Sequence, residues 1–237
     1  MTRHTATAFD ADLRDLADAI VDMGLRAQRQ ITDAIEALVT SNVELARSVK
    51  ARDVAIDGLQ HDIEDKAIGT IARRQPLAVD LREIVGALRI ASDLERIGDL
   101  ATNIAKRAEQ LGNEKWTDEI TIALRSMTQR VLGQLRRVIE SYDRRDLAEA
   151  LEVWTADEEI DALHNAIFRQ LLTYMMEDPG NISLGMHLLF CAKNIERIGD
   201  HATNIAESVY YIVQGGTIPG ERPKLGEIPL NNPSLYH

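Results

Sequence analysis

The stretch from Leu88 to Ala105 reads LRIASDLERIGDLATNIA, and the stretch from Leu189 to Ala206 reads LFCAKNIERIGDHATNIA. Twelve of the eighteen aligned positions are identical, and the second copy begins 101 positions after the first. Apolar residues return every three or four positions in each copy, which is the period of an amphipathic α-helix. The sequence therefore predicts an all-α protein built from two similar halves.

The segments around each copy follow the same helical spacing. Asp80 and Glu83 predict a capping box at the start of the first-copy helix, and Gly112 predicts its end. The expected fold is two pseudo-symmetric antiparallel three-helix bundles over residues 1–113 and 114–214, with an irregular Gly- and Pro-rich tail over 215–237. A single layer of six helices remains an alternative. The predicted helices cover residues 10–40, 43–74, 80–111, 120–138, 147–176 and 183–213.

Composition excludes several classes of function. The formal net charge of -11 argues against nucleic acid as a partner, because phosphate backbones require a basic surface. Cys191 is the single cysteine, so no internal disulfide forms, and its apolar surroundings predict a small core residue. We find no signal peptide and no apolar run long enough to span a membrane, so a cytoplasmic protein is expected, with membrane contact only through partners.

Acidic residues recur on one side of each repeat. Glu95, Asp99 and Asn103 lie four positions apart, and on a helical wheel they fall opposite Ile90 and Leu94, facing away from the core. An acidic stripe of this kind is usually a solvated face. Here, however, the same three residues return in the second copy as Glu196, Asp200 and Asn204, while nearby positions change.

The preceding helices carry further acids at the same spacing, Asp53 with Asp57 and Asp157 with Asp161. If neighbouring helices bring these acids beside the repeat, each half offers four carboxylates. Carboxylate oxygens favour hard cations such as magnesium, calcium, manganese or iron. His61 and His164 follow the same acids, although surface histidines without a ligand role are common.

Two other features of the repeat have competing interpretations. Arg96 and Arg197 either orient the carboxylates or bind phosphate, or they form ordinary surface ion pairs. Gly98 and Gly199, in mid-helix, allow close approach of a neighbouring helix or of a metal cluster, or they simply ease helix packing. The residues themselves do not decide between these alternatives.

The doubled ERIGD followed by ATNIA, the stretch RRQPLAVDLR from Arg73 to Arg82, and LLTYMMEDP from Leu171 to Pro179 resemble the PhoU family, and the resemblance covers nearly the whole chain. It implies a non-enzymatic adaptor between the phosphate ABC transporter and a sensor histidine kinase. Such an adaptor represses the phosphate-starvation response when phosphate is plentiful. The resemblance also implies a homodimer.

The same resemblance implies multinuclear clusters of divalent or iron metal ions, held by (Glu/Asp)-x-x-x-Asp motifs. It assigns no catalytic or organic-cofactor residues. Two other hypotheses compete with the adaptor: a carboxylate-bridged oxidase or hydrolase, although the sequence contains no Glu-x-x-His motif, and a plain helical scaffold. The implied metal ligands are Glu95, Asp99, Asp53, Asp57, Glu196, Asp200, Asp157 and Asp161, with Asn103, Asn204, Arg96 and Arg197 as additional ligands or orienting partners.

Overall fold

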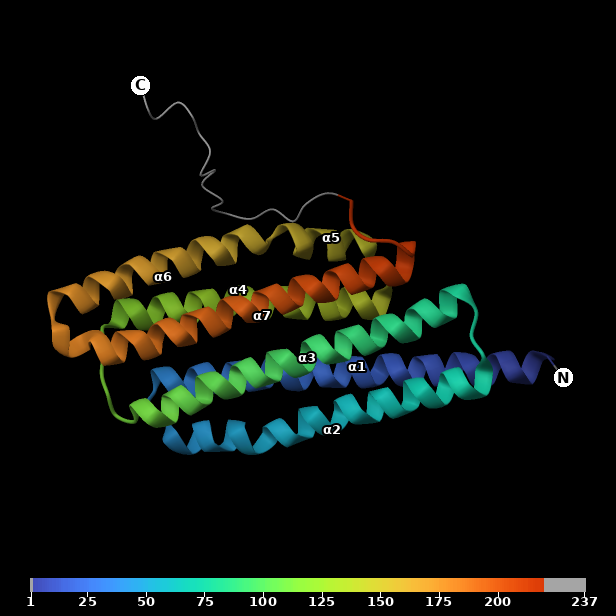
Figure 1. The fold of residues 1–237 in the computed structure, drawn as a ribbon, viewed down its shortest axis with the longest axis horizontal. Helices are drawn as coiled ribbons and strands as arrows, with labels where there is room; N and C mark the ends of the chain where they lie inside the picture. The colour runs from blue at the N-terminus through green and yellow to red at the C-terminus, as the bar shows by residue number, and fades with distance from the viewer. Residues whose placement is uncertain (1, 220–237) are drawn as a thin grey trace, which may run out of the picture.

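The protein is an elongated bundle of long helices (Figure 1). The computed structural model describes residues 2–219, with side chains from Phe9 onward except that of Asp157. No strand occurs within this range, which confirms the all-α prediction. The elements are α1 (Thr2–Val39), α2 (Val43–Arg74), α3 (Ala78–Leu111), α4 (Asp118–Arg144), α5 (Leu147–Thr155), α6 (Asp157–Glu177), the 3-10 turn η1 (Pro179–Asn181) and α7 (Ile182–Gln214).

Several helix ends lie where the sequence supplies a residue suited to starting or ending a helix. Gly112 after α3 and Gly215 after α7 have φ values of +56° and +79°, which glycine adopts without steric cost. Asn42 precedes α2, and its side-chain oxygen accepts a hydrogen bond from the Leu45 N–H at 3.0 Å. The connections between α1, α2 and α3 are short, so these three helices alternate in direction along the chain (Figure 1).

The predicted capping box at the start of α3 is wrong. The helix begins at Ala78, and Leu77, at the N-cap position, offers no side-chain oxygen. Asp80 lies within the first turn, and the Glu83 carboxylate instead accepts a hydrogen bond from Arg145 at the end of α4. Glu83 therefore forms a long-range ion pair with Arg145 and does not cap the helix.

Residues 147–176, predicted as one helix, form two. The chain breaks at Ala156, whose N–H donates to the carbonyls of both Glu152 and Val153, at 3.1 and 3.2 Å. The Thr155 hydroxyl also donates to the Glu152 carbonyl, at 3.0 Å. Competition of a side chain for a helical carbonyl bends or ends helices, and α6 begins afresh at Asp157.

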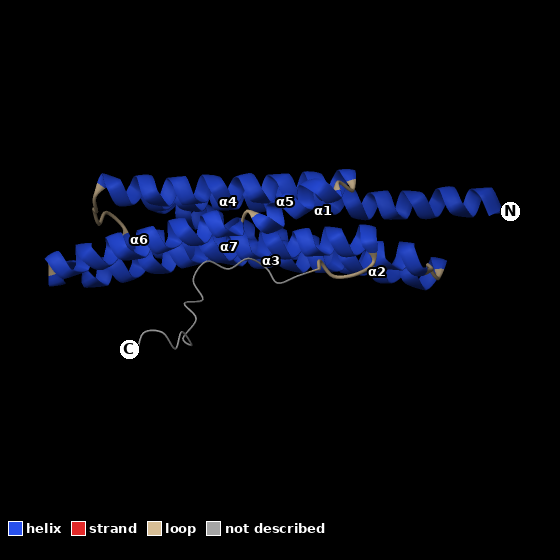
Figure 2. Cartoon of the chain, turned by 90° about the horizontal axis from the view of Figure 1, so that it is seen from above, coloured by secondary structure: helices blue, strands red, loops and turns tan. Residues whose placement is uncertain are grey.

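The helices form two layers (Figure 2). Helices α1 and α4 lie in one layer, while α2, α3, α7 and α6 lie side by side, in that order, in the other (Figure 1). Each half packs its own helices together, and the halves join through α3 against α7 and α1 against α4. The two repeat-bearing helices are therefore neighbours at the centre of the molecule.

The apolar stripe of the repeat forms the core of each half. Ile90, Leu94, Ile97, Ala101 and Ile104 are all fully buried, as the wheel predicted. Burying a Leu or Ile side chain contributes about 1.5–3 kcal/mol relative to exposure. Cys191 is also fully buried, and burial raises the pKa of its thiol to about 12, which fits a core residue rather than a nucleophile.

The two halves approach each other closely where α3 meets α7. A Cβ atom added to Gly86 would lie 2.3 Å from Cγ1 of Ile212 and 3.8 Å from the carbonyl oxygen of Ser208. The absence of a side chain at position 86 therefore allows α7 to reach its observed position.

Within residues 2–219, no helix is both long and apolar enough to cross a membrane.

Candidate functional site

The first-half carboxylates, namely Asp53 and Asp57 of α2 with Glu95 and Asp99 of α3, lie together as predicted. Burial, followed by the negative charge of Asp99, raises the pKa of Glu95, against the opposing effect of Arg96. Burial likewise raises the pKa of Asp57, followed by the charges of Asp53 and Asp99. Each of the two carboxyl groups thus senses acids on both helices.

The glutamates of the repeat lie deeper than the wheel indicates. The Glu95 side chain is 19% exposed and that of Glu196 is 13% exposed, whereas Asp99 is 46% exposed. A wheel considers one helix alone, but the adjacent helix, α2 or α6, covers the glutamate in the folded protein. These acids do not form a fully solvated face.

Arg96 forms loose ion pairs with its own helix. Its Nε lies 3.6 Å from Glu95 Oε2, and its Nη1 lies 3.7 Å from Asp99 Oδ2. The arginine side chain is mostly exposed, so these contacts contribute little stability, about 0–1 kcal/mol. Arg197 is exposed as well. Of the two interpretations of Arg96, the ordinary ion pair describes these contacts.

Gln30 of α1 is a site residue that sequence reasoning missed. Its side-chain amide is buried and lies 2.8 Å from Asp53 Oδ1, 2.9 Å from the Thr102 hydroxyl and 3.3 Å from the Gly98 carbonyl. It therefore links all three helices beneath the carboxylates. The available signal was a glutamine on the apolar stripe of α1, repeated as buried Gln134 on α4.

We expect Gln30→Leu to destabilise the protein by about 1–3 kcal/mol, because the Asp53 carboxylate and the Thr102 hydroxyl lose a buried donor. Urea unfolding followed by circular dichroism measures the change. Gln129→Leu, at an exposed position of α4, is the matched control and should shift stability by less than about 0.5 kcal/mol. Equal unfolding midpoints for the two variants would contradict a structural role for Gln30.

The second half differs around its glutamate. Lys193 Nζ lies 2.5 Å from Glu196 Oε2, and position 193 corresponds to Ser92 in the first half. Burial lowers the pKa of nearby His164, with Glu196 opposing and Lys193 reinforcing that shift. Asp161 and Asp200 are partly buried on α6 and α7, while the side chain of Asp157 falls outside the described residues. A lysine thus already neutralises part of the second acidic set.

The glycines of the repeat allow close helix packing. A Cβ on Gly98 would lie 3.2 Å from Ile56 Cδ1 and 3.6 Å from Asp53 Oδ1. A Cβ on Gly199 would lie 2.9 Å from Ile160 Cδ1. In each half an isoleucine of the neighbouring helix fills this space, so helix packing explains both glycines.

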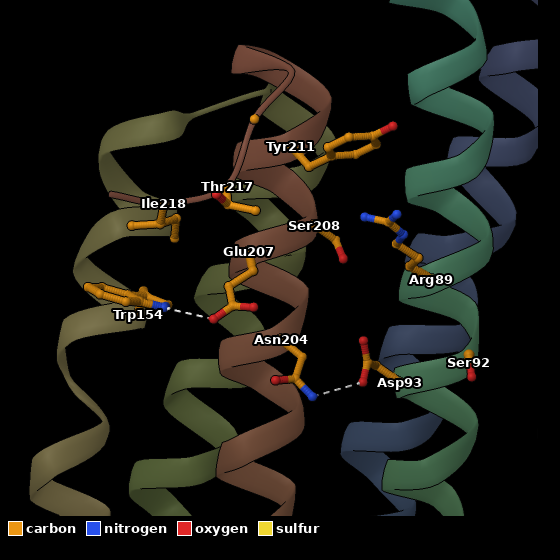
Figure 3. Close-up of a pocket in the computed structure, with 11 residues that line it drawn as sticks. Arg89, Ser92, Asp93, Trp154, Asn204, Glu207, Ser208, Tyr211, Thr217 and Ile218 are labelled. Atoms are coloured by element: carbon orange, nitrogen blue, oxygen red, sulfur yellow. Dashed lines mark hydrogen bonds between the residues drawn. The ribbon is translucent and has the colours of Figure 1, made fainter. Parts of the chain in front are cut away.

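The asparagines of the repeat point elsewhere. Asn103 is exposed, and its side-chain oxygen accepts a hydrogen bond from Lys106. Asn204 donates to Asp93 Oδ1 at 3.3 Å across a cavity of about 470 Å³ between α3 and α7 (Figure 3). The cavity also holds Arg89, stacked over the Tyr211 ring, and Trp154, which donates to Glu207. These hydrogen bonds lead to residues other than the acids predicted as ligands.

The chemistry of the first-half carboxylates suits a hard cation, since all four donors are carboxylate oxygens. Their oxygen atoms, however, are spread apart. Among the described side chains, no group of three or more His, Cys, Asp or Glu residues is placed to hold a metal ion. The acids are near enough to interact, but their oxygens do not converge on one point. A cation would have to draw them inward by side-chain rotation.

Comparison with known proteins gives concordant matches across both halves. The family model of the PhoU domain matches residues 20–108 and 124–209. A phosphate-specific transport system accessory protein PhoU homolog from Rhizobium meliloti is 48% identical over 221 residues, covering 93% of each chain. A homolog of the same name from Caulobacter vibrioides is 47% identical, covering 95% of this chain and 98% of the relative.

Solved structures agree with these matches. The crystal structure of PhoU from Pseudomonas aeruginosa superposes with a TM-score of 0.83 at 36% identity, covering 88% of this chain and all of that one. The phosphate transport system regulatory protein PhoU from Streptococcus pneumoniae gives a TM-score of 0.82 at 27% identity. Sequence and fold both extend the likeness over nearly the whole described chain, and the protein belongs to the PhoU family.

Proposed function

We propose that this protein is a regulatory accessory protein of phosphate transport that acts without catalysis. The observation that carries the proposal is the match to PhoU accessory proteins along both halves, at 48% identity over 93% of the chain. The buried, high-pKa thiol of Cys191 adds support, because it leaves the single cysteine unsuited to nucleophilic chemistry.

The partners in this proposal are the phosphate ABC transporter and a phosphate-sensing histidine kinase, and the protein acts as a cytoplasmic homodimer. The relatives' names connect those proteins with a transport system, which supports the first partner. The kinase and the dimer follow from the family resemblance of the repeated ERIGD segments. The net charge of -11 suits basic protein surfaces better than nucleic acid.

We also propose that the first-half carboxylates bind a divalent or iron cation. Burial and mutual repulsion raise the pKa of both Glu95 and Asp57, and a cation would relieve that repulsion. When bound, it supplies positive charge that joins α2 to α3. Asp157, Asp161, Glu196 and Asp200 form the corresponding candidate set in the second half, where a cation would have to displace Lys193 from Glu196.

Deletion of the gene tests the regulatory role. We expect a phosphate-starvation reporter, such as alkaline phosphatase activity, to rise in phosphate-rich medium to the level of starved cells, because the repressing adaptor is missing. Complementation with the wild-type chain should restore repression. A deletion strain that keeps the reporter low in rich medium would overturn the proposed function.

A further inference from the structure

Large apolar side chains gather on the outer surface of α6 and the first half of α7. Each is at least 44% exposed, in a part of the molecule where the core is already filled by Leu171, Leu188 and Cys191. Scattered exposed apolar residues are ordinary, but a contiguous group on two adjoining helices indicates a binding surface. The members are Phe168, Leu172, Met176, Ile182, Met186 and Phe190.

A hollow of about 260 Å³ lies within this surface. We call it the α6–α7 groove, and it is lined by His164, Phe168, Met186, Leu189, Phe190 and Lys193. The hollow is smaller than typical small-molecule pockets of about 300–1,000 Å³. It is better suited to anchoring side chains of a larger partner than to enclosing a small molecule.

The lining residues follow the geometry of a helix-binding groove. Met186, Leu189, Phe190 and Lys193 lie at spacings of three, four and seven, so they form one face over two turns of α7. Phe168 of α6 lies across from them. Helix α6 is at the outer edge of its layer, next to α7 (Figure 1). An amphipathic helix laid along such a pair inserts its own residues at the same spacings.

Charge decides which kind of helix fits. The residues that line the groove include no carboxylate, although the chain as a whole carries a net charge of -11. Lys193 is half-exposed at one end, and the Arg107 guanidinium lies 4.9 Å from the centre of the Phe190 ring. Arg107 also lies 3.3 Å from Nδ1 of His187. Lys193 is paired with Glu196, but Lys193 and Arg107 together outnumber that carboxylate, and such a rim around an apolar hollow is complementary to acidic flanking residues.

The first half has exposed apolar residues such as Ile68 and Leu81, but it lacks the residues that line the groove on α7. The residues that correspond to Met186, Phe190 and Lys193 are Val85, Arg89 and Ser92. Arg89 instead stacks over Tyr211 in the cavity between α3 and α7. The groove therefore diverged between the halves while the neighbouring ERIGD segment did not, which indicates a task that belongs to the second half alone.

We propose that the α6–α7 groove docks an amphipathic helix of a partner protein, with apolar anchors at i, i+3 or i+4 and i+7 and with Asp or Glu beside them. The inference rests on the proposed adaptor function and supplies one of its partner-binding surfaces. Phe168 and Phe190 contact the anchors, and Lys193 and Arg107 pair with the acids. Because Lys193 also contacts Glu196, the docked helix competes with that carboxylate for the lysine.

The test uses the full chain and a fluorescein-labelled amphipathic peptide with Leu and Phe anchors at these spacings and Glu at its flanks. A control peptide carries Lys in place of each Glu. Fluorescence anisotropy should show tighter binding of the acidic peptide. Phe190→Asp should weaken that binding about thirtyfold, the loss typical of an aromatic anchor. Ile68→Asp, which alters an exposed apolar residue of α2, is the matched control and should bind as the wild type does.

Lys193→Glu is a second variant, at an exposed position, that reverses the charge beside the groove and leaves its apolar wall intact. This charge reversal should weaken binding of the acidic peptide and strengthen binding of the basic peptide. Equal affinity of the wild type for both peptides would overturn the proposal. Two other results would also overturn it. If Phe190→Asp dissociates a dimer that the peptide leaves intact, the groove serves a second copy of the chain. If neither peptide binds and Phe190→Asp abolishes binding to anionic vesicles, the groove serves lipid.

The starvation reporter separates this inference from the proposed function. If Phe190→Asp and Lys193→Glu both lose peptide binding yet repress normally, the adaptor role stands and the groove is not its working surface, which overturns the inference. Loss of repression together with loss of peptide binding, in variants that melt normally, supports both.

Discussion

The double variant Glu95→Gln, Asp99→Asn is expected to lose its stabilisation by divalent cations while becoming more stable in their absence. A cation at a hundredfold excess over its Kd stabilises a folded protein by about 2.7 kcal/mol. For a chain of this size that corresponds to a rise of about 5–10 °C in Tm. Without the carboxylates the rise should disappear, as measured by thermal melts with Mn²⁺, with Mg²⁺ and with chelator.

The expected gain in stability of this variant without metal follows from the pKa shifts. Glu95 and Asp57 have raised pKa values, so their carboxyl groups hold protons more tightly in the folded chain than in the unfolded one. Their contribution to stability is fully present below the ordinary pKa of a carboxyl group and is lost as the pH rises through the raised pKa. At neutral pH the unneutralised acids therefore oppose folding, and neutral amides remove that cost.

Asp18→Asn with Asp22→Asn provides the control, since these acids share the four-residue spacing on α1 but are not among the acids predicted as ligands. This pair should leave the cation-dependent rise in Tm intact. Isothermal titration with Mn²⁺ gives an independent measure of binding. Undiminished Mn²⁺ binding by the Glu95→Gln, Asp99→Asn variant would remove these residues from the ligand set.

The second large effect is expected at Gly86, where Ala should destabilise the protein by about 1–3 kcal/mol despite its higher helix propensity. The added Cβ would lie 2.3 Å from Ile212 Cγ1, so either the isoleucine or the whole of α7 must shift. At about 2–4 °C per kcal/mol, the loss is readily seen as a lower Tm.

Gly133→Ala in α4 is the matched control, because no atom beyond its own helix backbone and chain neighbours lies within 4 Å of the new Cβ. This change should stabilise by about 0.5–1 kcal/mol through helix propensity alone. Ile212→Ala should reduce the effect of Gly86→Ala, since the two side chains occupy the same space. Parallel shifts in Tm for the two glycine variants would show that the halves are not tightly packed at position 86.

Local pattern predicted most of the helices and the proximity of the first-half carboxylates, whose role as metal ligands stays a prediction. Three-to-four spacing found the buried stripe of Ile90 and Leu94, and glycine marked the ends of α3 and α7. The four-residue spacing of acids found carboxylates that do meet across α2 and α3. These features depend on periodicity within single helices and on short connections between them.

Features that depend on contacts between distant segments could not be predicted. The pairing of Glu83 with Arg145, the amide of Gln30 beneath Asp53 and the close approach of Gly86 to Ile212 all join residues far apart in the chain. The contact of Lys193 with Glu196 is local, but it occurs in the second half alone, so the identical positions of the repeat give no sign of it. Where the repeats differ, packing between helices decides each residue's role.

The burial of Cys191 has a practical consequence for studying conformational change in this protein. It is the single cysteine of the chain, it lies in the core, and burial raises the pKa of its thiol to about 12. Because the thiolate is the nucleophile that attacks thiol-modifying reagents, the native residue stays unmodified while the protein is folded. A cysteine introduced at an exposed site such as Ile68 is therefore the one that reacts with a spin label or fluorophore. Cys191 need not be replaced before labelling, so the core keeps its wild-type packing.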